Sequence, residues 1–221
     1  MTAIGFEKSK AFYYENGFYL TSDPKRLHKL ISHYELYKKI IDLPGEVVEF
    51  GVFKGASLIR FATFRECLET FSSRKIFGFD AFGDFPVPND GVQSDQKFIS
   101  EFSQIAGKGI PESELTLRLD DKGFKNIELI SGDILQTAPA FLSENPHIRV
   151  ALLHIDLDVY SPSRLALDLF YPRMVSGGLI VLDDYGTVEG ETVAVEEFLS
   201  DKNLKLKKLP LTNIPTYIEV P

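Results

Sequence analysis

Short apolar runs alternate with amphipathic helical patterns along most of this chain. The apolar runs are rich in β-branched and aromatic residues and are bounded by turn residues, which is typical of strands. We predict five strands: EVVEFG (46–51), KIFGFD (75–80), NIELISGD (126–133), VALLHID (150–156) and GGLIVLDD (177–184). Apolar residues at helical spacing separate most of them, over about 56–71, 137–144 and 162–169. Strands that alternate with helices indicate a parallel sheet covered by helices on both faces.

Both ends of the chain add to this pattern. On the N-terminal side, Pro24 precedes a helical pattern over 26–41, within a helical extension that we place at 1–45. On the C-terminal side, a helical pattern over about 189–200 is followed by two short apolar runs, LKLKKLP and TYIEV. Two such runs in quick succession predict an antiparallel hairpin at the edge of the sheet.

A long connection, residues 82–125, separates the second strand from the third. Its first part, FGDFPVPNDG, is a loop by composition, and helical patterns follow near 95–106 and 112–121. Long segments beside strand ends usually serve a binding site, so we expect an acceptor loop or lid here. The whole pattern predicts a single α/β domain over 1–221, Rossmann-like and doubly wound, with a mainly parallel sheet of about seven strands.

Composition sets limits on partners and compartment. Of 221 residues, 44% are hydrophobic and 12% are aromatic, which is enough for one sizeable core. The net charge is -8, and the lysines and arginines are scattered, so we expect no nucleic-acid partner. No apolar run approaches the roughly 20 residues of a membrane span, and the N-terminal residues lack a secretory apolar region. We therefore expect a cytoplasmic protein without a membrane partner.

Cysteine and histidine offer little chemistry in this sequence. Cys67 is the single cysteine, which excludes an internal disulfide and a cysteine-based zinc site. It lies in an apolar helical pattern, so we expect it to be buried. His154 follows an apolar run, and we favour a packed core histidine over a catalytic one. The other three histidines, His28, His33 and His147, are expected at surface or helix positions.

Every predicted strand ends in an acid, which is the most informative feature of the sequence. The acids are Glu49, Asp80, Asp133, Asp156 with Asp158, and Asp183 with Asp184. Ligands of an open parallel sheet bind outside the carboxyl ends of its strands, so these side chains are expected to meet at one site. Asp133 taken alone is equally well explained as a helix N-cap.

The first strand leads into EFGVFKGAS, a turn with glycines at positions 51 and 55. Gly51 and Gly55 let the backbone approach a ligand and let a helix N-terminus point into the pocket. The turn lacks the G-x-G-x-x-G of dinucleotide sites, and Glu49 would repel phosphate but suit amino and sulfonium groups. We therefore predict S-adenosylmethionine rather than NAD, with Asp80 placed for the ribose hydroxyls. Val52 and Ser57 of the same turn are counted as cofactor-binding.

The second group of acids predicts a metal. Four carboxylates, Asp156, Asp158, Asp183 and Asp184, are costly to place together without a cation. A set of oxygen ligands without cysteine suits Mg²⁺, with Ca²⁺ or Mn²⁺ as substitutes.

Several motifs taken in order resemble the TylF/MycF-type macrocin O-methyltransferases, a class I family dependent on S-adenosylmethionine and Mg²⁺. The similarity covers about residues 26–200 and is carried by RLHKLI, PGEVVEFGVFKGASL, FGFDAFGDFP, SGDILQTAP, HIDLDVYSPSRLALDLFYPRMVSGGLIVLDDYG and AVEEFL. This sequence departs from the family in two places. It has GVFKGAS where G-V-W-R-G-G is usual, and only the short GTVEGET follows DDY. The second departure affects the expected identity of the acceptor more than the expected methyl-transfer chemistry.

The resemblance implies roles for individual residues. Asp156, Asp183 and Asp184 match the metal ligands, and Asp158 matches the general base. Gly132 and Asp133 fall beside the adenine, while Tyr160 and Tyr185 are compatible with either packing or the acceptor site.

The expected function is metal-dependent O-methylation of a small hydroxylated acceptor, a sugar or similar vicinal diol of a natural product or glycan. The resemblance also favours a homodimer. A catechol-type methyltransferase, a D-x-D glycosyltransferase and a catalytically silent binding module are the alternatives.

Overall fold

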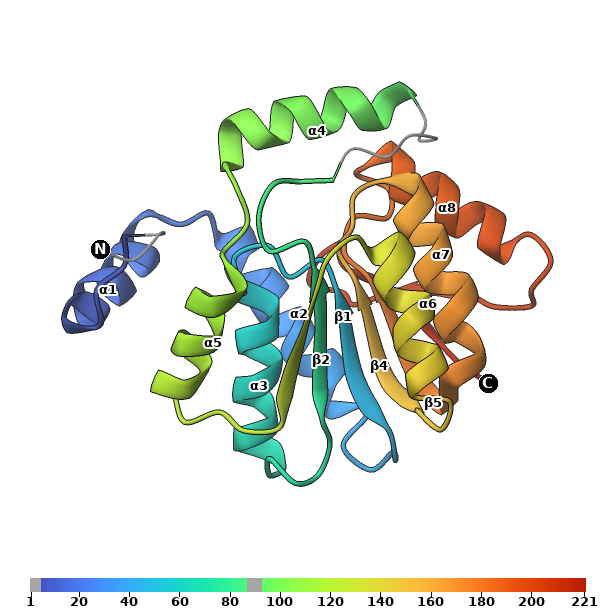
Figure 1. The fold of residues 1–221 in the computed structure, drawn as a ribbon, viewed down its shortest axis with the longest axis horizontal. Helices are drawn as coiled ribbons and strands as arrows, with labels where there is room; N and C mark the ends of the chain where they lie inside the picture. Colours follow the sequence, from blue (N-terminus) through green and yellow to red (C-terminus); the bar gives the residue numbers. More distant parts are fainter. Residues whose placement is uncertain (1–4, 87–92) are drawn as a thin grey trace.

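The computed structural model describes residues 5–86 and 93–221, and it contains a seven-stranded sheet (Figure 1). The strand order is β3-β2-β1-β4-β5-β7-β6. The first five strands pair in parallel, whereas β7 pairs antiparallel with both β5 and β6. The strands are β1 (Glu46–Phe50), β2 (Ile76–Asp80), β3 (Ile127–Ser131), β4 (Val150–Ile155), β5 (Met174–Leu182), β6 (Leu206–Lys208) and β7 (Thr216–Glu219). The predicted fold class is therefore confirmed, including the antiparallel C-terminal pair.

The domain has three layers, because one layer of helices covers each face of the sheet. Apolar residues of α6, α7 and α8 pack on one face, and those of α2, α3 and α5 pack on the other. In Figure 1, α4 crosses above the sheet, and α1 projects to the side. The helices are α1 (Ala11–Thr21), α2 (Pro24–Lys38), α3 (Ala56–Leu68), α4 (Gln93–Ala106), α5 (Glu112–Asp121), α6 (Ile134–Glu144), α7 (Tyr160–Phe170) and α8 (Glu189–Leu199), with short 3-10 turns η1 (Lys8–Lys10) and η2 (Tyr171–Arg173).

Capping side chains explain where two of the helices begin. Pro24 is the first residue of α2, as predicted, and the preceding Asp23 accepts a hydrogen bond from the Lys25 amide at 2.8 Å. Asp133 caps α6 in the same way by accepting from the Leu135 amide at 3.0 Å. This cap starts α6 about one turn earlier than the sequence pattern predicted.

The long connection contains the two predicted helices, α4 and α5. Residues 87–92 of its predicted loop lie outside the described residues. Only α4 lies beyond the carboxyl ends of the strands, where it contacts α8, whereas α5 packs on the sheet face beside α3 (Figure 1). The first part of the connection is thus positioned beside the carboxyl ends of the strands.

The prediction that Cys67 is buried is wrong. Cys67 is exposed near the end of α3, because the buried side of that helix is formed by Phe61, Ala62 and Phe64. The apolar residues around Cys67 in the sequence belong to a different face of the helix.

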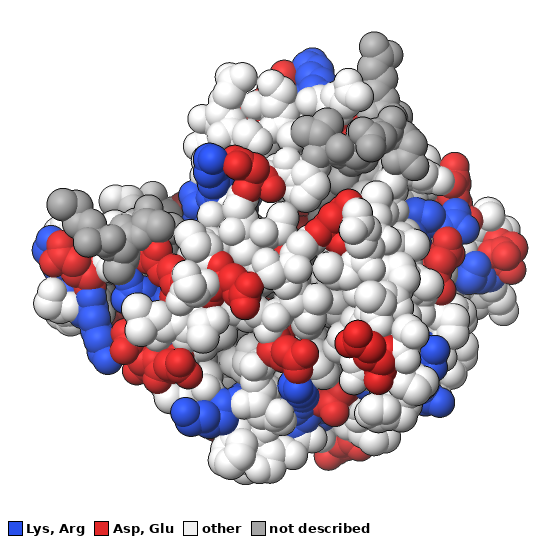
Figure 2. All heavy atoms as spheres, viewed as in Figure 1, with Lys and Arg blue, Asp and Glu red and all other residues white. Residues whose placement is uncertain are grey.

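Acidic and basic side chains are interspersed over the described part of the face seen in Figure 2, without one broad patch of either sign. No helix in residues 5–86 and 93–221 is both long and apolar enough to span a bilayer.

Candidate functional site

A cavity of about 390 Å³ lies at the carboxyl ends of the strands. Its volume is within the range of about 300–1,000 Å³ typical of small-molecule sites. Nine of the twelve predicted site residues line it: Gly51, Val52, Ser57, Asp80, Gly132, Asp133, Asp156, Asp158 and Asp184. The remaining three, Glu49, Gly55 and Asp183, lie behind the cavity wall.

Asp80 organises the turn that follows β1. One carboxylate oxygen accepts hydrogen bonds from the amides of Val52 and Phe53, both at 2.8 Å, and the other accepts from the amide of Phe82 at 2.7 Å. These bonds join the ends of β1 and β2 into one rigid wall of the cavity. A carboxylate oxygen has two lone pairs, and among the described residues Oδ1 accepts only the bond from Phe82, so acceptor capacity is left for a ligand hydroxyl.

Gly51 brings this turn against the end of β4. Its φ is +86°, and a Cβ at this position would overlap the carbonyl oxygen of Asp156. Only glycine combines this backbone conformation with so close an approach. The predicted cofactor turn and the predicted metal ligands are therefore direct neighbours.

Glu49 and Gly55 support the turn from behind. Glu49 is fully buried, and its carboxylate accepts a short hydrogen bond from the Ser57 hydroxyl. A Cβ on Gly55 would lie 2.8 Å from Leu115 of α5, because the turn packs tightly against that helix. Neither residue lines the cavity, but the other oxygen of Glu49 is buried without a hydrogen-bond partner, so their contact with the cofactor stays a prediction.

The three predicted metal ligands lie together. Oxygen atoms of Asp156, Asp183 and Asp184 are within 4.8 Å of one another, and one oxygen of Asp184 is buried without a hydrogen-bond partner. Asp156 and Asp184 face the cavity, whereas Asp183 is fully buried. A compact set of carboxylate oxygens with spare acceptor capacity fits a hard divalent cation such as Mg²⁺.

The acids of this cluster titrate far from their usual range. Burial, then the charge of Asp183, raises the pKa of Asp156 well above its usual value. Burial, then the charge of Asp158, raises the pKa of Asp184 to about 9. Burial, then the charge of Asp156, raises the pKa of Asp158 to about 7. A cation among these groups would reverse the mutual repulsion that contributes to each shift.

Asp158 differs from the three predicted metal ligands in its backbone conformation. Its φ is +64°, a left-handed conformation that is uncommon outside glycine, and its carbonyl accepts from the Glu191 amide at 3.1 Å. Strained residues of this kind cluster at functional sites. The conformation holds the Asp158 side chain at the cavity, beside the carboxylates of the predicted metal site.

Lys29, which the sequence analysis missed, reaches into this cluster from α2. Its ammonium group forms a short ion pair with one oxygen of Asp183. Burial alone would lower the pKa of Lys29, but the charges of Asp156 and Asp183 outweigh it and raise the pKa to about 12. The lysine therefore remains charged and neutralises part of the acidic cluster.

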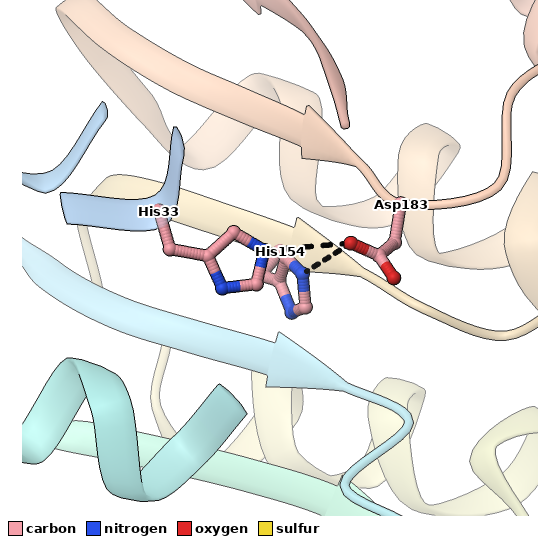
Figure 3. A group of neighbouring side chains, drawn as sticks. All are labelled: His33, His154 and Asp183. Atoms are coloured by element: carbon pink, nitrogen blue, oxygen red, sulfur yellow. Dashed lines mark hydrogen bonds and ion pairs between the residues drawn. The ribbon is translucent and has the colours of Figure 1, made fainter. Parts of the chain in front are cut away.

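Two buried histidines lie behind Asp183, as Figure 3 shows. Nε2 of His33 is 3.4 Å from Oδ1 of Asp183, and Nε2 of His154 is 3.6 Å from the same oxygen. His154 also places Nδ1 3.4 Å from Oε1 of Glu49. His154 thus bridges the carboxylate behind the cofactor turn and the carboxylate behind the metal site.

The two histidines differ in charge. Burial would lower the pKa of His154, but Asp183 and Glu49 raise it to about 10. Burial lowers the pKa of His33 to about 4 despite its bond to Asp183. With Asp183, the pair could also hold a metal, but all three are fully buried. We interpret them as the network that fixes Asp183. His154 is buried as predicted, whereas His33 lies on a helix but not at the surface.

The missed residues share a readable signal. Arg26, Lys29 and His33 are three and four positions apart, so they lie on one face of α2. A stripe of basic and imidazole side chains on one helix face indicates a site rather than a solvated surface. Arg60, which lines the cavity from α3, and Glu191 of α8, whose carboxylate accepts from the Asp184 amide at 3.1 Å, give no comparable signal in the sequence.

Tyr160 and Tyr185 contribute little to the cavity. Their hydroxyls donate to Glu197 at 2.6 Å and to Glu196 at 3.3 Å, and both acceptors belong to α8. Neither tyrosine is among the residues that line the cavity. Of the two possibilities left by the sequence, the structure favours packing.

The fold and its site define a class I methyltransferase. The structure of the O-methyltransferase NovP, at 22% identity, superimposes with a TM-score of 0.75 over 87% of this chain and 79% of that chain. The structure of CalS11, a calicheamicin methyltransferase, is 25% identical, with a TM-score of 0.70 over 97% of this chain and 86% of that chain.

The chain belongs to the macrocin O-methyltransferase (TylF) family, whose model matches residues 22–217. Demethyldecarbamoylnovobiocin O-methyltransferase of Streptomyces niveus is 25% identical over 162 residues, 71% of this chain and 59% of that protein. Mycinamicin III 3''-O-methyltransferase of Micromonospora griseorubida is 28% identical over 151 residues, 65% of this chain and 56% of that protein. The matched part is thus less than two thirds of the length of either relative.

Proposed function

We propose that this protein transfers a methyl group from S-adenosylmethionine to a sugar hydroxyl of a natural product, with the help of Mg²⁺. The observation that carries the proposal is the contact between Gly51 and Asp156. It supports the proposal because the turn that we assign to the cofactor lies beside a carboxylate cluster suited to a divalent cation. A methyl donor and a metal-held acceptor would meet in one cavity.

The nucleoside end of the donor would lie along the walls formed by the ends of β2 and β3. Asp80 has acceptor capacity for ribose hydroxyls, and Gly132 and Asp133 line the cavity next to it. S-adenosylmethionine supplies an electrophilic methyl group, whose bond to sulfur breaks with its electron pair as the acceptor oxygen attacks. The protein's task is then to align that oxygen and to remove its proton.

The metal would be held by Asp156, Asp183 and Asp184. Two observations support this assignment, namely the compact carboxylate set and the unpartnered buried oxygen of Asp184. Mg²⁺ held there would act as a Lewis acid that lowers the pKa of an acceptor hydroxyl. The buried His154 supports Asp183 from behind, and Lys29, which lines the cavity, pairs with the other oxygen of Asp183.

Asp158 would act as the general base. Its carboxylate faces the cavity, and burial with the charge of Asp156 raises its pKa to about 7. A base with a pKa near the working pH combines a large deprotonated fraction with a strong pull on the proton. The acceptor's hydroxyl proton would pass to Asp158 as the new bond from oxygen to carbon forms.

The connection over 82–125 would form the acceptor side of the cavity. Phe85, Pro86 and Phe102 of this connection line the cavity opposite the strand ends. Apolar and aromatic side chains of this kind suit the face of a sugar ring or of an attached apolar scaffold. The mycinamicin and novobiocin relatives bear names of large natural-product substrates, which supports an acceptor of this class.

A mass-spectrometric screen tests the proposal. The protein is incubated with S-adenosylmethionine carrying a deuterated methyl group and with a panel of glycosides, sugar nucleotides and catechols, each with Mg²⁺ or with a chelator. We expect label in a glycoside or sugar nucleotide that has adjacent free hydroxyls, and only with Mg²⁺. Transfer to catechols alone would replace the sugar acceptor with an aromatic diol.

A further inference from the structure

Two arginines face the cavity from different helices, and the chemistry described above uses neither of them. Arg26 lies in the first turn of α2 and Arg60 in the second turn of α3, and both line the cavity. Neither side chain has a hydrogen bond or an ion pair with any residue that the structure describes. Arg60 is also half-buried, so its charge is only partly hydrated.

The two guanidinium groups are close enough to repel each other. Burial, and then the positive charge of Arg26, lowers the pKa of Arg60 from its usual value. Two like charges at a cavity wall become favourable when an anion lies between them, because guanidinium groups bind carboxylate or phosphate with paired hydrogen bonds. The pair therefore indicates a subsite for an anionic group.

The geometry of the donor points to one particular anion. A sulfonium carries three substituents, which here are a methyl group, an adenosyl group and an amino-acid chain. If the adenosyl group lies at Asp80 and Gly132 and the methyl group faces Asp158, the chain must turn to the remaining wall. That wall is the start of α3, where Ala56 and Arg60 line the cavity one above the other.

We propose that Arg26 and Arg60 bind the α-carboxylate of the donor, an assignment that rests on the proposed function. The cavity then carries opposite charges at its two ends. The arginines lie at the wall formed by α2 and α3, and the acids lie at the ends of β4 and β5. The carboxylate faces the arginines, while the sulfonium lies toward the acids. This arrangement fixes the direction of the donor and aims its methyl group at Asp158.

Two ligands that differ only in the carboxylate test the proposal. S-adenosylhomocysteine and its decarboxylated analogue are titrated calorimetrically into wild type, Arg26→Gln, Arg60→Gln and the double variant. Arg164→Gln is the charge-matched control, because Arg164 pairs with Asp168 on the surface of α7. Thermal melting of each variant shows that it is folded.

We expect wild type to bind S-adenosylhomocysteine at least about tenfold more tightly than the analogue, as charged hydrogen bonds require. Each single variant should lose about tenfold in affinity for S-adenosylhomocysteine and less than about twofold for the analogue. Arg60→Lys should recover part of the preference, and Arg164→Gln should match wild type. Equal losses for both ligands, or no preference in wild type, would overturn the assignment.

A separate titration distinguishes the other source of an anion, a phosphate group on the acceptor. Pyrophosphate is titrated into wild type and Arg60→Gln, both already saturated with S-adenosylhomocysteine. We expect no binding, because the donor's carboxylate occupies the arginines. If pyrophosphate binds to wild type and Arg60→Gln abolishes that binding, the assignment is overturned. The arginines would then bind a phosphate group of the acceptor. Failure of wild type to bind S-adenosylhomocysteine at all would instead overturn the proposed function.

Discussion

Lys29 on α2 forms an ion pair with Asp183 at the end of β5, a residue 154 positions further along the chain. This contact joins the N-terminal part of the chain to the candidate metal site. It also means that a positive charge already lies among the carboxylates before any metal is bound. Lys29 and a divalent cation therefore compete for the negative charge of Asp183.

Replacing Lys29 should strengthen metal binding. We expect Lys29→Met to bind Mn²⁺ or Mg²⁺ about tenfold more tightly than wild type, because removal of a nearby like charge favours the cation. Lys25→Met is the matched control, since Lys25 lies on the same helix and its side chain is exposed. Calorimetry measures the affinities, and weaker or unchanged metal binding in Lys29→Met would refute the competition.

The contact between Gly51 and Asp156 makes a prediction about stability. Gly51→Ala should lower the free energy of unfolding by about 3 kcal/mol or more, because it adds a backbone clash to a left-handed conformation. Gly123→Ala is the control, as Gly123 has a φ of +72° but open space around its Cα. That variant should lose only about 1 kcal/mol. Denaturant unfolding gives both values, and equal losses would show that the clash is absent.

Asp158→Asn separates chemistry from binding. We expect turnover to fall by about 10²-fold to 10⁴-fold, as for loss of a general base, while the affinity for S-adenosylhomocysteine stays within about twofold. Single-turnover kinetics and calorimetry supply the two numbers. Turnover close to that of wild type would remove Asp158 from the role of base.

The rate should also depend on pH through Asp158. Only the deprotonated carboxylate accepts a proton, and its pKa is raised to about 7, so the rate should rise with pH through that region. A bound divalent cation favours the charged form, so the rising limb measured with Mg²⁺ should lie below about pH 7. A rate profile that is flat from about pH 5 to 9 would contradict this assignment.

His154 should stabilise the fold by neutralising two buried acids. His154→Leu leaves Glu49 and Asp183 without the cation between them and should cost about 3 kcal/mol, whereas the exposed His147→Leu should cost little. The pKa of His154 in the folded protein, about 10, lies above the ordinary histidine value of 6.5. The stabilisation is therefore complete below about pH 6.5 and is lost as the pH rises through about 10. A difference between the two variants that does not shrink with rising pH would count against a charged His154.

The sequence predicted the fold well because its signals are local. Strands such as β4 and helices such as α5 follow from the spacing of apolar residues, and Pro24 marked the start of α2 correctly. The start of α6 was less accurate, because the cap formed by Asp133 extends the helix beyond its apolar pattern. Cys67 was misplaced because sequence spacing did not show which face of α3 meets the sheet.

The site was only partly predictable. The acids at the strand ends were found because a parallel sheet brings these ends together, whatever the packing of the helices. Lys29 and His33 were missed because their role depends on how α2 packs against the sheet. Glu49 was predicted at the cofactor, but no signal in the sequence indicated that one of its oxygens contacts Ser57 and His154. Apart from the spacing of Arg26, Lys29 and His33 on α2, contacts between distant segments leave little trace in the sequence of either segment.

The central claim is that a donor pocket and a metal site lie side by side in one cavity. Calorimetric titration of S-adenosylhomocysteine into wild type, with and without saturating Mg²⁺, tests it most directly. We predict micromolar binding of S-adenosylhomocysteine. We also predict binding of Mg²⁺ that Asp184→Asn weakens while the affinity for S-adenosylhomocysteine is kept. Absence of S-adenosylhomocysteine binding both with and without Mg²⁺ would contradict this claim.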